Sequence, residues 1–190
     1  MSANADLAAE LLVHLARLAQ AGGGHRLTPA QWTALRFFAR ANRLSRTPSA
    51  FSAFHATTRG TASQTVKSLV ALGLLERHRN EEDGRSIRFE LTAAGRAALD
   101  EDPLRVLADR IDGLGEAERL RFLAVLQGLA GALSEQQAAP VFGTCTDCAH
   151  CDVAAEGAFC RCAEAMVLAG EMEALCISFR PRPDAARRIG

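Results

Sequence analysis

The chain has 190 residues, which is enough for one domain with an appendage or for two small domains. Hydrophobic residues make up 48% and charged residues 23%, a composition that excludes collagen-like and wholly disordered chains. No apolar run approaches the ~20 residues of a membrane span, and the N-terminus lacks the basic-then-apolar pattern of a signal peptide. We therefore expect a cytoplasmic protein without membrane contact, in which the cysteines do not form a disulfide framework.

The formal net charge of zero hides an uneven charge distribution. From Leu11 to Leu75 the chain holds eight basic residues and no acid, whereas Asp100 to Cys176 holds fourteen acids and five arginines. Such asymmetry indicates an N-terminal half that faces a polyanion, although solvated helix faces are the plainer alternative.

The residues before Gly73 predict four helices. The leucine spacing predicts an amphipathic helix over Asp6–Ala21 that ends at the three following glycines. Thr28 and Thr47 each precede a proline, which is typical of an N-cap followed by the first helical residue. A further helix is expected from about Thr61 to Gly73.

A hairpin and a second helical region follow. Leu74–His78 and Ser86–Leu91 predict two strands around a polar turn. Thr92 is expected to cap a helical region that runs to about Gln137 with one break near Gly113–Gly115. A linker near residue 140 divides the chain into predicted domains 1–139 and 140–190. The expected fold is mainly α with a small β-hairpin wing: a winged helix-turn-helix with long dimerisation helices and a C-terminal cysteine-rich metal-binding segment.

Several segments resemble the MarR family of transcription regulators, and together they span roughly Asp6 to Gln137. They are Leu27–Trp32, Ser63–Leu69, Gly73–Arg77, Asp83–Ser86 and Leu91–Arg96. The resemblance implies a recognition helix in the major groove and a wing whose aspartate, Asp83, orients Arg85 toward the minor groove. The candidate DNA-binding residues are Arg59, Ser63, Gln64, Thr65, Lys67, Ser68, Arg79, Asp83, Arg85 and Arg88.

Two further features concern the resemblance. The family's usual leucine-alanine pattern before the recognition helix is replaced by Phe51 and Phe54, which we expect in the core. The first helix and the helices after Ala93 resemble the family's dimerisation elements. A leucine stripe could serve a monomer's own core, but helices this long have little surface of a small winged domain to cover. We expect a homodimer on pseudo-palindromic double-stranded DNA.

All six cysteines lie between Cys145 and Cys176, in the pattern C-x2-C-x2-C-x8-C-x-C-x13-C. Thiolates are soft ligands, and a two-residue gap lets two sulfurs converge on one metal. A C-x2-C-x2-C triplet with a remote fourth cysteine favours an iron–sulfur cluster, as in bacterial ferredoxins. The alternative is zinc, although a zinc ribbon more often shows two separated C-x2-C pairs.

The segment Phe142–His150, with Phe159-Cys160 and Leu175-Cys176, resembles a cysteine-bearing C-terminal extension of some MarR-like proteins. The resemblance implies Cys145, Cys148, Cys160 and Cys176 as ligands, with Cys151 and Cys162 as alternates. The ferredoxin pattern itself would use Cys151 in place of Cys160, and His150 is a further possible donor. A 4Fe–4S cluster is favoured over 2Fe–2S. Because the segment follows a linker, we expect oxidants to reach it and its changes to pass to the adjoining dimerisation helices.

These features predict a DNA-binding regulator, a repressor, whose operator binding responds to an iron–sulfur cluster that senses redox, oxygen or iron status. One alternative is a regulator with a structural zinc ion and a small-molecule effector bound between the winged domain and the dimer helices. An electron-transfer or redox-enzyme subunit is less favoured, because it would not need the acid-free segment. No enzyme is expected, since no nucleophile–base pair, phosphate-binding glycine loop or paired carboxylates stand out.

Overall fold

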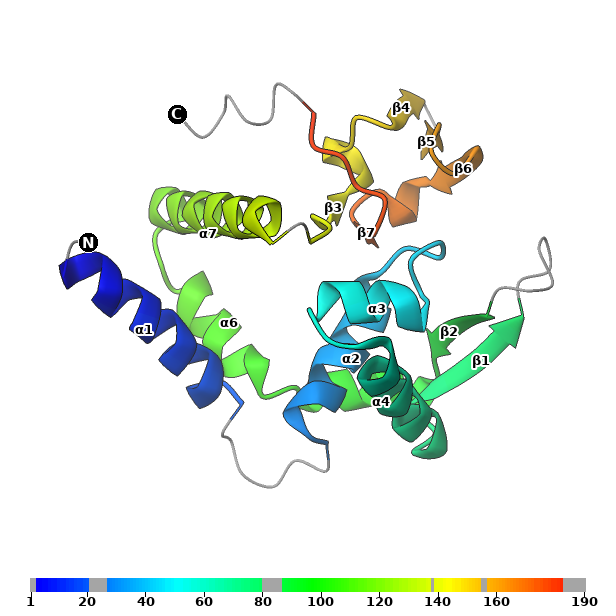
Figure 1. Ribbon diagram of the computed structural model, residues 1–190, viewed down its shortest axis with the longest axis horizontal. Coiled ribbons are helices and arrows are strands. Elements are labelled where there is room, and N and C mark those ends of the chain that lie inside the picture. The colour runs from blue at the N-terminus through cyan, green and yellow to red at the C-terminus, as the bar shows by residue number, and fades with distance from the viewer. Residues whose placement is uncertain (1–2, 21–26, 80–86, 138, 155–156, 183–190) are drawn as a thin grey trace.

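The computed structural model describes residues 3–20, 27–79, 87–137, 139–154 and 157–182 (Figure 1). The N-terminal part is a winged helix followed by long helices, and the C-terminal part consists of short strands. Its helices and strands are α1 (Ala3–Leu18), α2 (Pro29–Arg40), α3 (Pro48–Phe54), α4 (Arg59–Ala71), β1 (Leu75–Arg79), β2 (Ile87–Leu91), α5 (Ala93–Ala98), α6 (Leu104–Asp112), α7 (Glu116–Gln136), β3 (Gly143–Thr144), β4 (Cys151–Ala154), β5 (Gly157–Cys160), β6 (Ala165–Leu168) and β7 (Leu175–Cys176). The mainly helical fold with a hairpin wing agrees with the sequence prediction.

Threonine caps define where the helices of the winged domain (residues 27–79 and 87–98) begin. The side chains of Thr28, Thr47 and Thr92 each accept a backbone N–H from the first turn of the helix that follows. α4 begins two residues before the predicted Thr61, because Thr58 is its N-cap. Gly73 follows this helix with a φ of +70°, a conformation that glycine adopts without steric cost.

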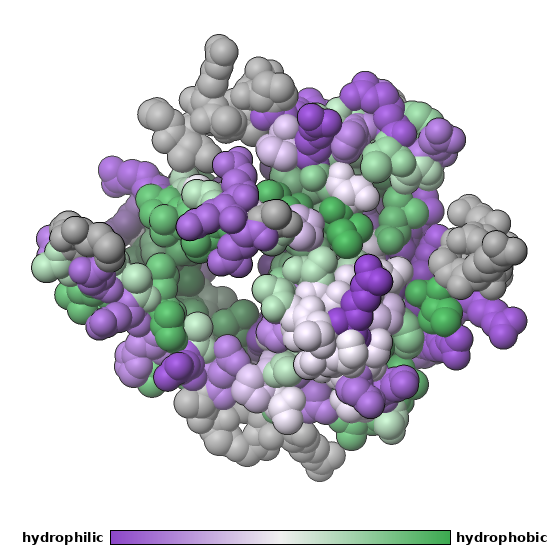
Figure 2. All heavy atoms as spheres, viewed as in Figure 1, coloured by the Kyte–Doolittle hydropathy of each residue, from purple (hydrophilic) through white to green (hydrophobic). Residues whose placement is uncertain are grey.

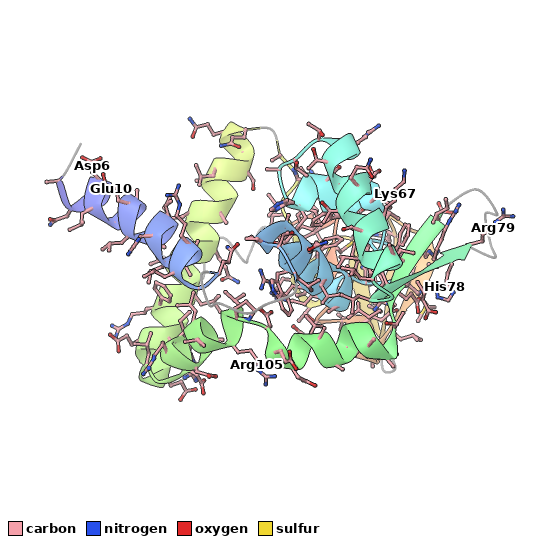
Figure 3. The ribbon with its side chains drawn as sticks, turned by 90° about the horizontal axis from the view of Figure 1, so that it is seen from below. Asp6, Glu10, Lys67, His78, Arg79 and Arg105 are labelled. Atoms are coloured by element: carbon pink, nitrogen blue, oxygen red, sulfur yellow. The ribbon has the colours of Figure 1, made fainter. Side chains whose placement is uncertain are left out.

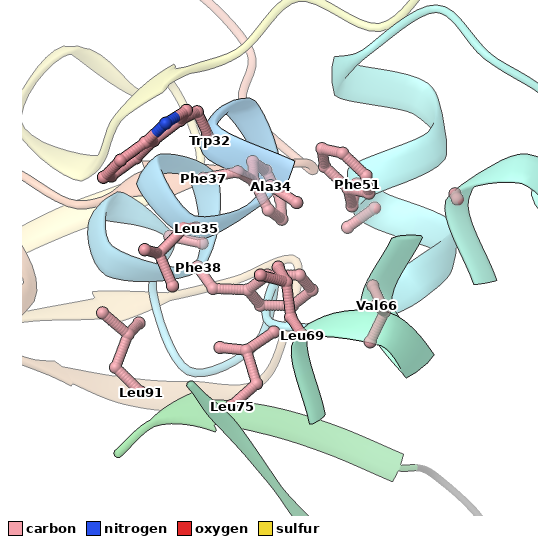
Figure 4. Close-up of a cluster of buried hydrophobic side chains, with 13 residues drawn as sticks. Trp32, Ala34, Leu35, Phe37, Phe38, Phe51, Val66, Leu69, Leu75 and Leu91 are labelled. Atoms are coloured by element: carbon pink, nitrogen blue, oxygen red, sulfur yellow. The ribbon is translucent and has the colours of Figure 1, made fainter. Parts of the chain in front are cut away.

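Aromatic side chains of α2 and α3 fill the core of the winged domain (Figure 4). Phe37 and Phe38 of α2 are buried, and their ring centroids lie 5.6 and 6.1 Å from the ring of Phe51 on α3. Leu69 of α4 and Leu75 of the wing close the same core. The expected core position of Phe51 is confirmed. Phe54 instead remains partly exposed and packs against Phe37 at 5.0 Å.

The helical region after the wing has a second break that the sequence interpretation missed. Between α5 and α6 the backbone of Asp102 is extended, with φ −62° and ψ 120°. Pro103 explains the break, since a proline disfavours the helical conformation in the residue before it. Asp102 is buried, accepts the Leu104 N–H at 2.9 Å and pairs with Arg36 of α2 at 2.7 Å. This hinge therefore ties the winged domain to the helices that follow.

The three helices α1, α6 and α7 contain no buried residue among those described. Figure 1 shows them beside the winged domain, and Figure 2 shows hydrophobic side chains gathered around them on the left of the view. The exposed hydrophobic residues on α1 and α7 are Leu7, Leu11, Leu12, Val13, Leu15, Leu18, Leu120, Leu123, Val125, Leu129 and Leu133. No helix in the described part of the chain is long and apolar enough to cross a membrane.

The cysteine module (residues 139–154 and 157–182) contains two small antiparallel sheets that were not predicted. β3 pairs with β7, and β4–β5–β6 form a three-stranded sheet in which Cys151 lies opposite Cys160. The predicted fold class named only the wing as β structure, and the structure adds a small C-terminal β region. Strands of two to four residues are too short to show the period-two pattern that identified the hairpin.

Candidate DNA-binding surface and cysteine centre

α4 presents a polar face to solvent at helical spacing. Its buried residues are Ala62, Val66 and Leu69, which pack into the winged-domain core. Gln64 and Lys67 are exposed on the opposite side, and Arg59 is exposed at the helix start. Ser63 and Thr65 flank this face and are partly exposed. The exposed residues are free to approach a groove of DNA.

The side chain of Ser68 is partly exposed and makes hydrogen bonds within the protein. Its hydroxyl accepts a hydrogen bond from Gln31 Nε2 of α2 at 3.0 Å and donates to the carbonyl oxygen of Thr65 at 2.7 Å. Ser68 therefore joins α4 to α2, and its contact with DNA stays a prediction. The hydroxyl of Thr65 likewise donates to the Thr61 carbonyl oxygen at 3.0 Å.

The wing carries the remaining candidate residues. Arg79 is exposed at the end of β1, and Arg88 of β2 is partly exposed opposite His78. Figure 3 shows Lys67, His78 and Arg79 at the end of the molecule remote from Asp6 and Glu10 of α1. Asp83 and Arg85 lie outside the described residues, so their positions remain predictions.

Of the seven basic residues of the acid-free segment that the structure describes, three form ion pairs within the protein. Arg36, Arg43 and Arg46 pair with Asp102, Glu171 and Glu90 at 2.7, 3.3 and 3.6 Å. All three acids come from outside the segment. Counting charges along the sequence therefore overestimates how many basic residues of the segment are left without an ion pair. The segment therefore offers less free positive charge than predicted: exposed basic residues remain on α4 (Arg59 and Lys67), on α1 (Arg17) and on α2 (Arg40).

A cavity of about 710 Å³ lies between α3, α4 and the wing. Its lining includes the apolar side chains of Val70, Ile87 and Phe89 and the cations of Lys67 and Arg77. Sequence reasoning missed it, because residues from three separate elements build its wall.

Five of the six cysteines are buried in the cysteine module, and Cys162 is exposed. Burial raises the pKa of the Cys145 thiol; a hydrogen bond with Cys151 acts in the opposite direction, and Cys176, Cys148 and Cys160 raise it further. Burial is also the main cause that raises the pKa of Cys151, followed by the nearby Cys145 thiol. The other four buried thiols therefore lie near Cys145, whereas we had expected the segment to be open to oxidants.

The gathered thiols do not form a closed coordination shell. Within the described ranges, no group of three or more His, Cys, Asp or Glu side chains is arranged to hold a metal ion. The donor set nevertheless fits a thiophilic group, because soft thiolates are the preferred ligands of zinc and of iron–sulfur clusters. Neutral thiols must lose protons when they bind such a group.

Arg182 holds the loop that carries the cysteine triplet. Its guanidinium donates from Nε to the Cys148 carbonyl oxygen at 3.1 Å and from Nη2 to the Cys151 carbonyl oxygen at 2.9 Å. Arg161 donates to the Ala149 carbonyl oxygen of the same loop at 2.6 Å. No sequence pattern identifies either arginine, since the contacts join residues far apart in the chain.

The cysteine module packs against the α2–α3 corner (Ala41–Thr47) of the winged domain, as Figure 1 shows for β3 and β7. The Asn42 N–H donates to the Leu175 carbonyl oxygen at 2.9 Å, and the Ile177 N–H donates to Ser45 Oγ at 3.0 Å. The Phe142 ring stacks edge-on against Phe54 with centroids 5.1 Å apart. These contacts lead to the winged domain; the predicted effect of the module on the adjoining long helices stays a prediction.

Comparisons with known proteins agree with this architecture. Residues 26–86, from the segment before α2 to the start of β2, match the MarR family model. No curated protein matches the chain. A MarR family transcription regulator of known structure is 22% identical, with 71% of this chain and 91% of that chain aligned at a TM-score of 0.54.

Two further solved structures share the fold. A MarR family protein from Bacillus stearothermophilus is 23% identical, and the match covers 70% of this chain and 99% of that chain at a TM-score of 0.53. S. aureus MepR, solved in complex with DNA, is 18% identical, with coverages of 67% and 94% and a TM-score of 0.54. The winged-helix part of the chain therefore matches the MarR family model over residues 26–86, and the chain shares the fold of solved MarR family proteins.

Proposed function

We propose that this regulator acts in the cytoplasm as a homodimeric repressor, and that its affinity for operator DNA depends on an iron–sulfur cluster held by the cysteine module. The observation that carries the proposal is the burial of five thiols in a module that packs directly on the winged domain. DNA binding and cysteine chemistry then belong to one structural unit.

The DNA-binding part rests on the exposed face of α4. Gln64 would read base edges in the major groove, and Arg59 and Lys67 would contact phosphates or bases. Arg79 and Arg88, with the predicted Asp83 and Arg85, would bring the wing to the adjacent backbone or minor groove. The similar fold of MepR, which was solved bound to DNA, supports this assignment.

The dimer is supported by the exposed leucines of α1 and α7. Leu11, Leu123 and Leu129 are each close to half exposed, and they belong to helices without any buried described residue. A surface of this kind is typical of an interface between protein chains. A second copy would cover it and would hold two recognition helices at the spacing of a pseudo-palindromic operator.

The small number of buried side chains in the cysteine module supports the presence of a cluster. Besides the five cysteines, its buried described residues are only Gly157, Ala158, Val167 and Leu175. A unit this small needs staples such as a bound metal centre, because its apolar core cannot offset the entropy of ordering the chain. Four thiolates around a cluster would supply such a staple.

We assign Cys145, Cys148, Cys160 and Cys176 as the ligands of a 4Fe–4S cluster, with Cys151 as the alternate. The exposure of Cys162 favours its exclusion from the ligand set. When bound, the cluster would supply a redox- and iron-sensitive link among the β strands. Arg182 would keep the backbone of Cys148 and Cys151 in place, and its positive charge would partly neutralise the negative charge of the thiolates.

Anaerobic purification, followed by visible spectroscopy and analysis of iron, acid-labile sulfide and zinc, tests the cluster. We expect iron and sulfide in stoichiometric amounts, lost in serine variants of the four ligands and retained in the control Cys162→Ser. Gel-shift titrations with and without the cluster then test the regulation. Stoichiometric zinc without sulfide would replace the cluster by the structural-zinc alternative, and equal operator affinities would refute the sensing role.

A second candidate function is regulation by a small molecule, which the cavity between α3, α4 and the wing favours. Its apolar walls and its two cations, Lys67 and Arg77, suit an amphipathic anion. Such an effector would compete with DNA for Lys67. Titration with benzoate as a probe should weaken operator binding in the wild type and have no effect in Arg77→Ala.

A further inference from the structure

The proposed ligand Cys176 is held from both sides by the α2–α3 corner. The carbonyl oxygen of the preceding Leu175 accepts the Asn42 N–H at 2.9 Å, and the N–H of the following Ile177 donates to Ser45 Oγ at 3.0 Å. Asn42 and Ser45 are 2% and 0% exposed. A hydrogen bond in such a buried site is costly to break, because water cannot replace the lost partner. Cys176 therefore cannot shift far without moving the corner.

The corner itself is a closed turn that leads into α3. The Ser45 N–H donates to the Asn42 side-chain oxygen at 2.9 Å, which joins the two residues that hold β7. The Ser45 carbonyl oxygen accepts the Thr47 N–H at 2.8 Å, and Thr47 is the N-cap of α3. A displacement at Ser45 thus acts on the first turn of this helix.

The corner also touches the wing. The Arg46 carbonyl oxygen accepts the Phe89 N–H of β2 at 2.9 Å, and the Arg46 guanidinium pairs with Glu90 at 3.6 Å. α3 packs directly on the recognition helix α4. Both DNA-contacting elements, the recognition helix and the wing, therefore connect to the same short turn.

We propose that the α2–α3 corner transmits the state of the cysteine centre to α4 and the wing, with Ser45 as the positioning residue for Cys176. This inference rests on the proposed function and names the route of its regulation. Cys176 would be one ligand of the centre, so binding or loss of the centre would act on its backbone, and the two hydrogen bonds beside Cys176 would pass a change in its position to the corner. Thermodynamic linkage makes this coupling reciprocal: the factor by which the filled centre changes the affinity for operator DNA equals the factor by which operator DNA changes the affinity for the centre.

The first test is Ser45→Ala, which removes the hydroxyl that accepts the Ile177 N–H but leaves every cysteine in place. Ser52→Ala is the matched control. Ser52 is also a buried serine, but it lies within α3 and its hydroxyl donates to the Ser49 carbonyl oxygen of the same helix, not to the cysteine module. Each variant is purified anaerobically as the full chain. Its iron content, its visible spectrum and its operator Kd with and without the cluster are then measured.

We expect the wild-type Kd ratio between the two states to lie in the range of about 5- to 150-fold that is typical of allosteric coupling. Ser45→Ala should retain iron but reduce this ratio by about fivefold, the effect of one lost buried hydrogen bond. Ser52→Ala should keep the wild-type ratio. Hydrogen exchange gives a readout apart from DNA binding: the amides of residues 41–47 and 87–91 should respond to the cluster in the wild type and respond less in Ser45→Ala.

The outcomes separate this inference from the proposed function. A wild type without a cluster, or with a Kd ratio of one, overturns the proposed function and the transmission route together. A wild-type ratio that differs from one and is unchanged in Ser45→Ala overturns the route alone.

If Ser45→Ala does not fold, the ion pair that crosses the same interface provides a second test. Arg43 Nε lies 3.3 Å from a Glu171 carboxylate oxygen. Arg43→Glu and Glu171→Arg should each reduce the Kd ratio, and the double reversal should restore it. Failure of the double variant to restore the ratio, or unchanged ratios in the single variants, would refute the route.

Discussion

The hinge between the winged domain and helices α6 and α7 depends on one buried carboxylate. Asp102 makes a charge-assisted hydrogen bond to Arg36 at 2.7 Å and accepts the Leu104 N–H at 2.9 Å. The side chains of Arg36 and Asp102 are only 18% and 8% exposed, so the ion pair is poorly screened by solvent. Asp102→Ala removes both bonds and leaves the Arg36 charge without this partner. We expect it to lower the free energy of unfolding by about 2–4 kcal/mol.

Urea denaturation, followed by the fluorescence of the single tryptophan, measures this loss, since Trp32 lies in the winged-domain core. Asp100→Ala is the control within the same hinge. Asp100 is 82% exposed and pairs with an exposed Arg105 at 3.5 Å, so its removal should change the stability by less than about 1 kcal/mol. Operator affinity should fall with Asp102→Ala, because in the proposed dimer the hinge would fix the two recognition helices relative to each other. A variant as stable as the Asp100→Ala control would refute this account of the hinge.

Three further predictions concern other parts of the chain. Gln64→Ala should change base preference in binding-site selection, whereas Lys67→Ala should weaken binding to all sequences and reduce the salt slope by about 1. Gly95→Ala should lower the free energy of unfolding in urea by about 3 kcal/mol, because the added Cβ would lie 2.1 Å from the Leu74 carbonyl oxygen. Gly113→Ala is the control and should leave the stability nearly unchanged, because its Cβ would have no neighbour closer than 3.5 Å. Iodoacetamide should label Cys162 of the metal-free protein first, which mass spectrometry can map, since the other thiols are buried.

Local sequence signals predicted the winged domain well because its helix ends are encoded locally. Thr28 and Thr47 cap the helices that they were expected to cap. The break at Pro103 was also visible in the sequence, yet the continuing leucine stripe suggested an unbroken helix. The strands of the cysteine module carried no such signal. Their pairing depends on contacts between distant residues, as in the register of Cys151 with Cys160.

The sequence could predict those residues of the candidate site whose exposure depends only on their position along one helix. The exposed positions of Arg59, Gln64 and Lys67 follow from the buried stripe of the same helix. Ser68 differs because its partner, Gln31, lies 37 residues away on another helix. The role of Ser45 is hidden for the same reason, since its partner Ile177 lies 132 residues away. Helical spacing in the sequence identifies which residues share one face of a helix. It does not identify which other helix or strand packs on that face.

The position of the cysteine module distinguishes two ways in which a dimeric regulator can respond. A sensor on the dimer helices changes the distance between the recognition helices, which matters only when both contact DNA. The contacts of Asn42 and Ser45 with β7 act within one subunit, on the corner that precedes α3. The proposed cluster should therefore change the affinity for an isolated half-site as well as for the full operator. Gel-shift titration with both duplexes measures this, and a response confined to the full operator would instead indicate a change in dimer geometry.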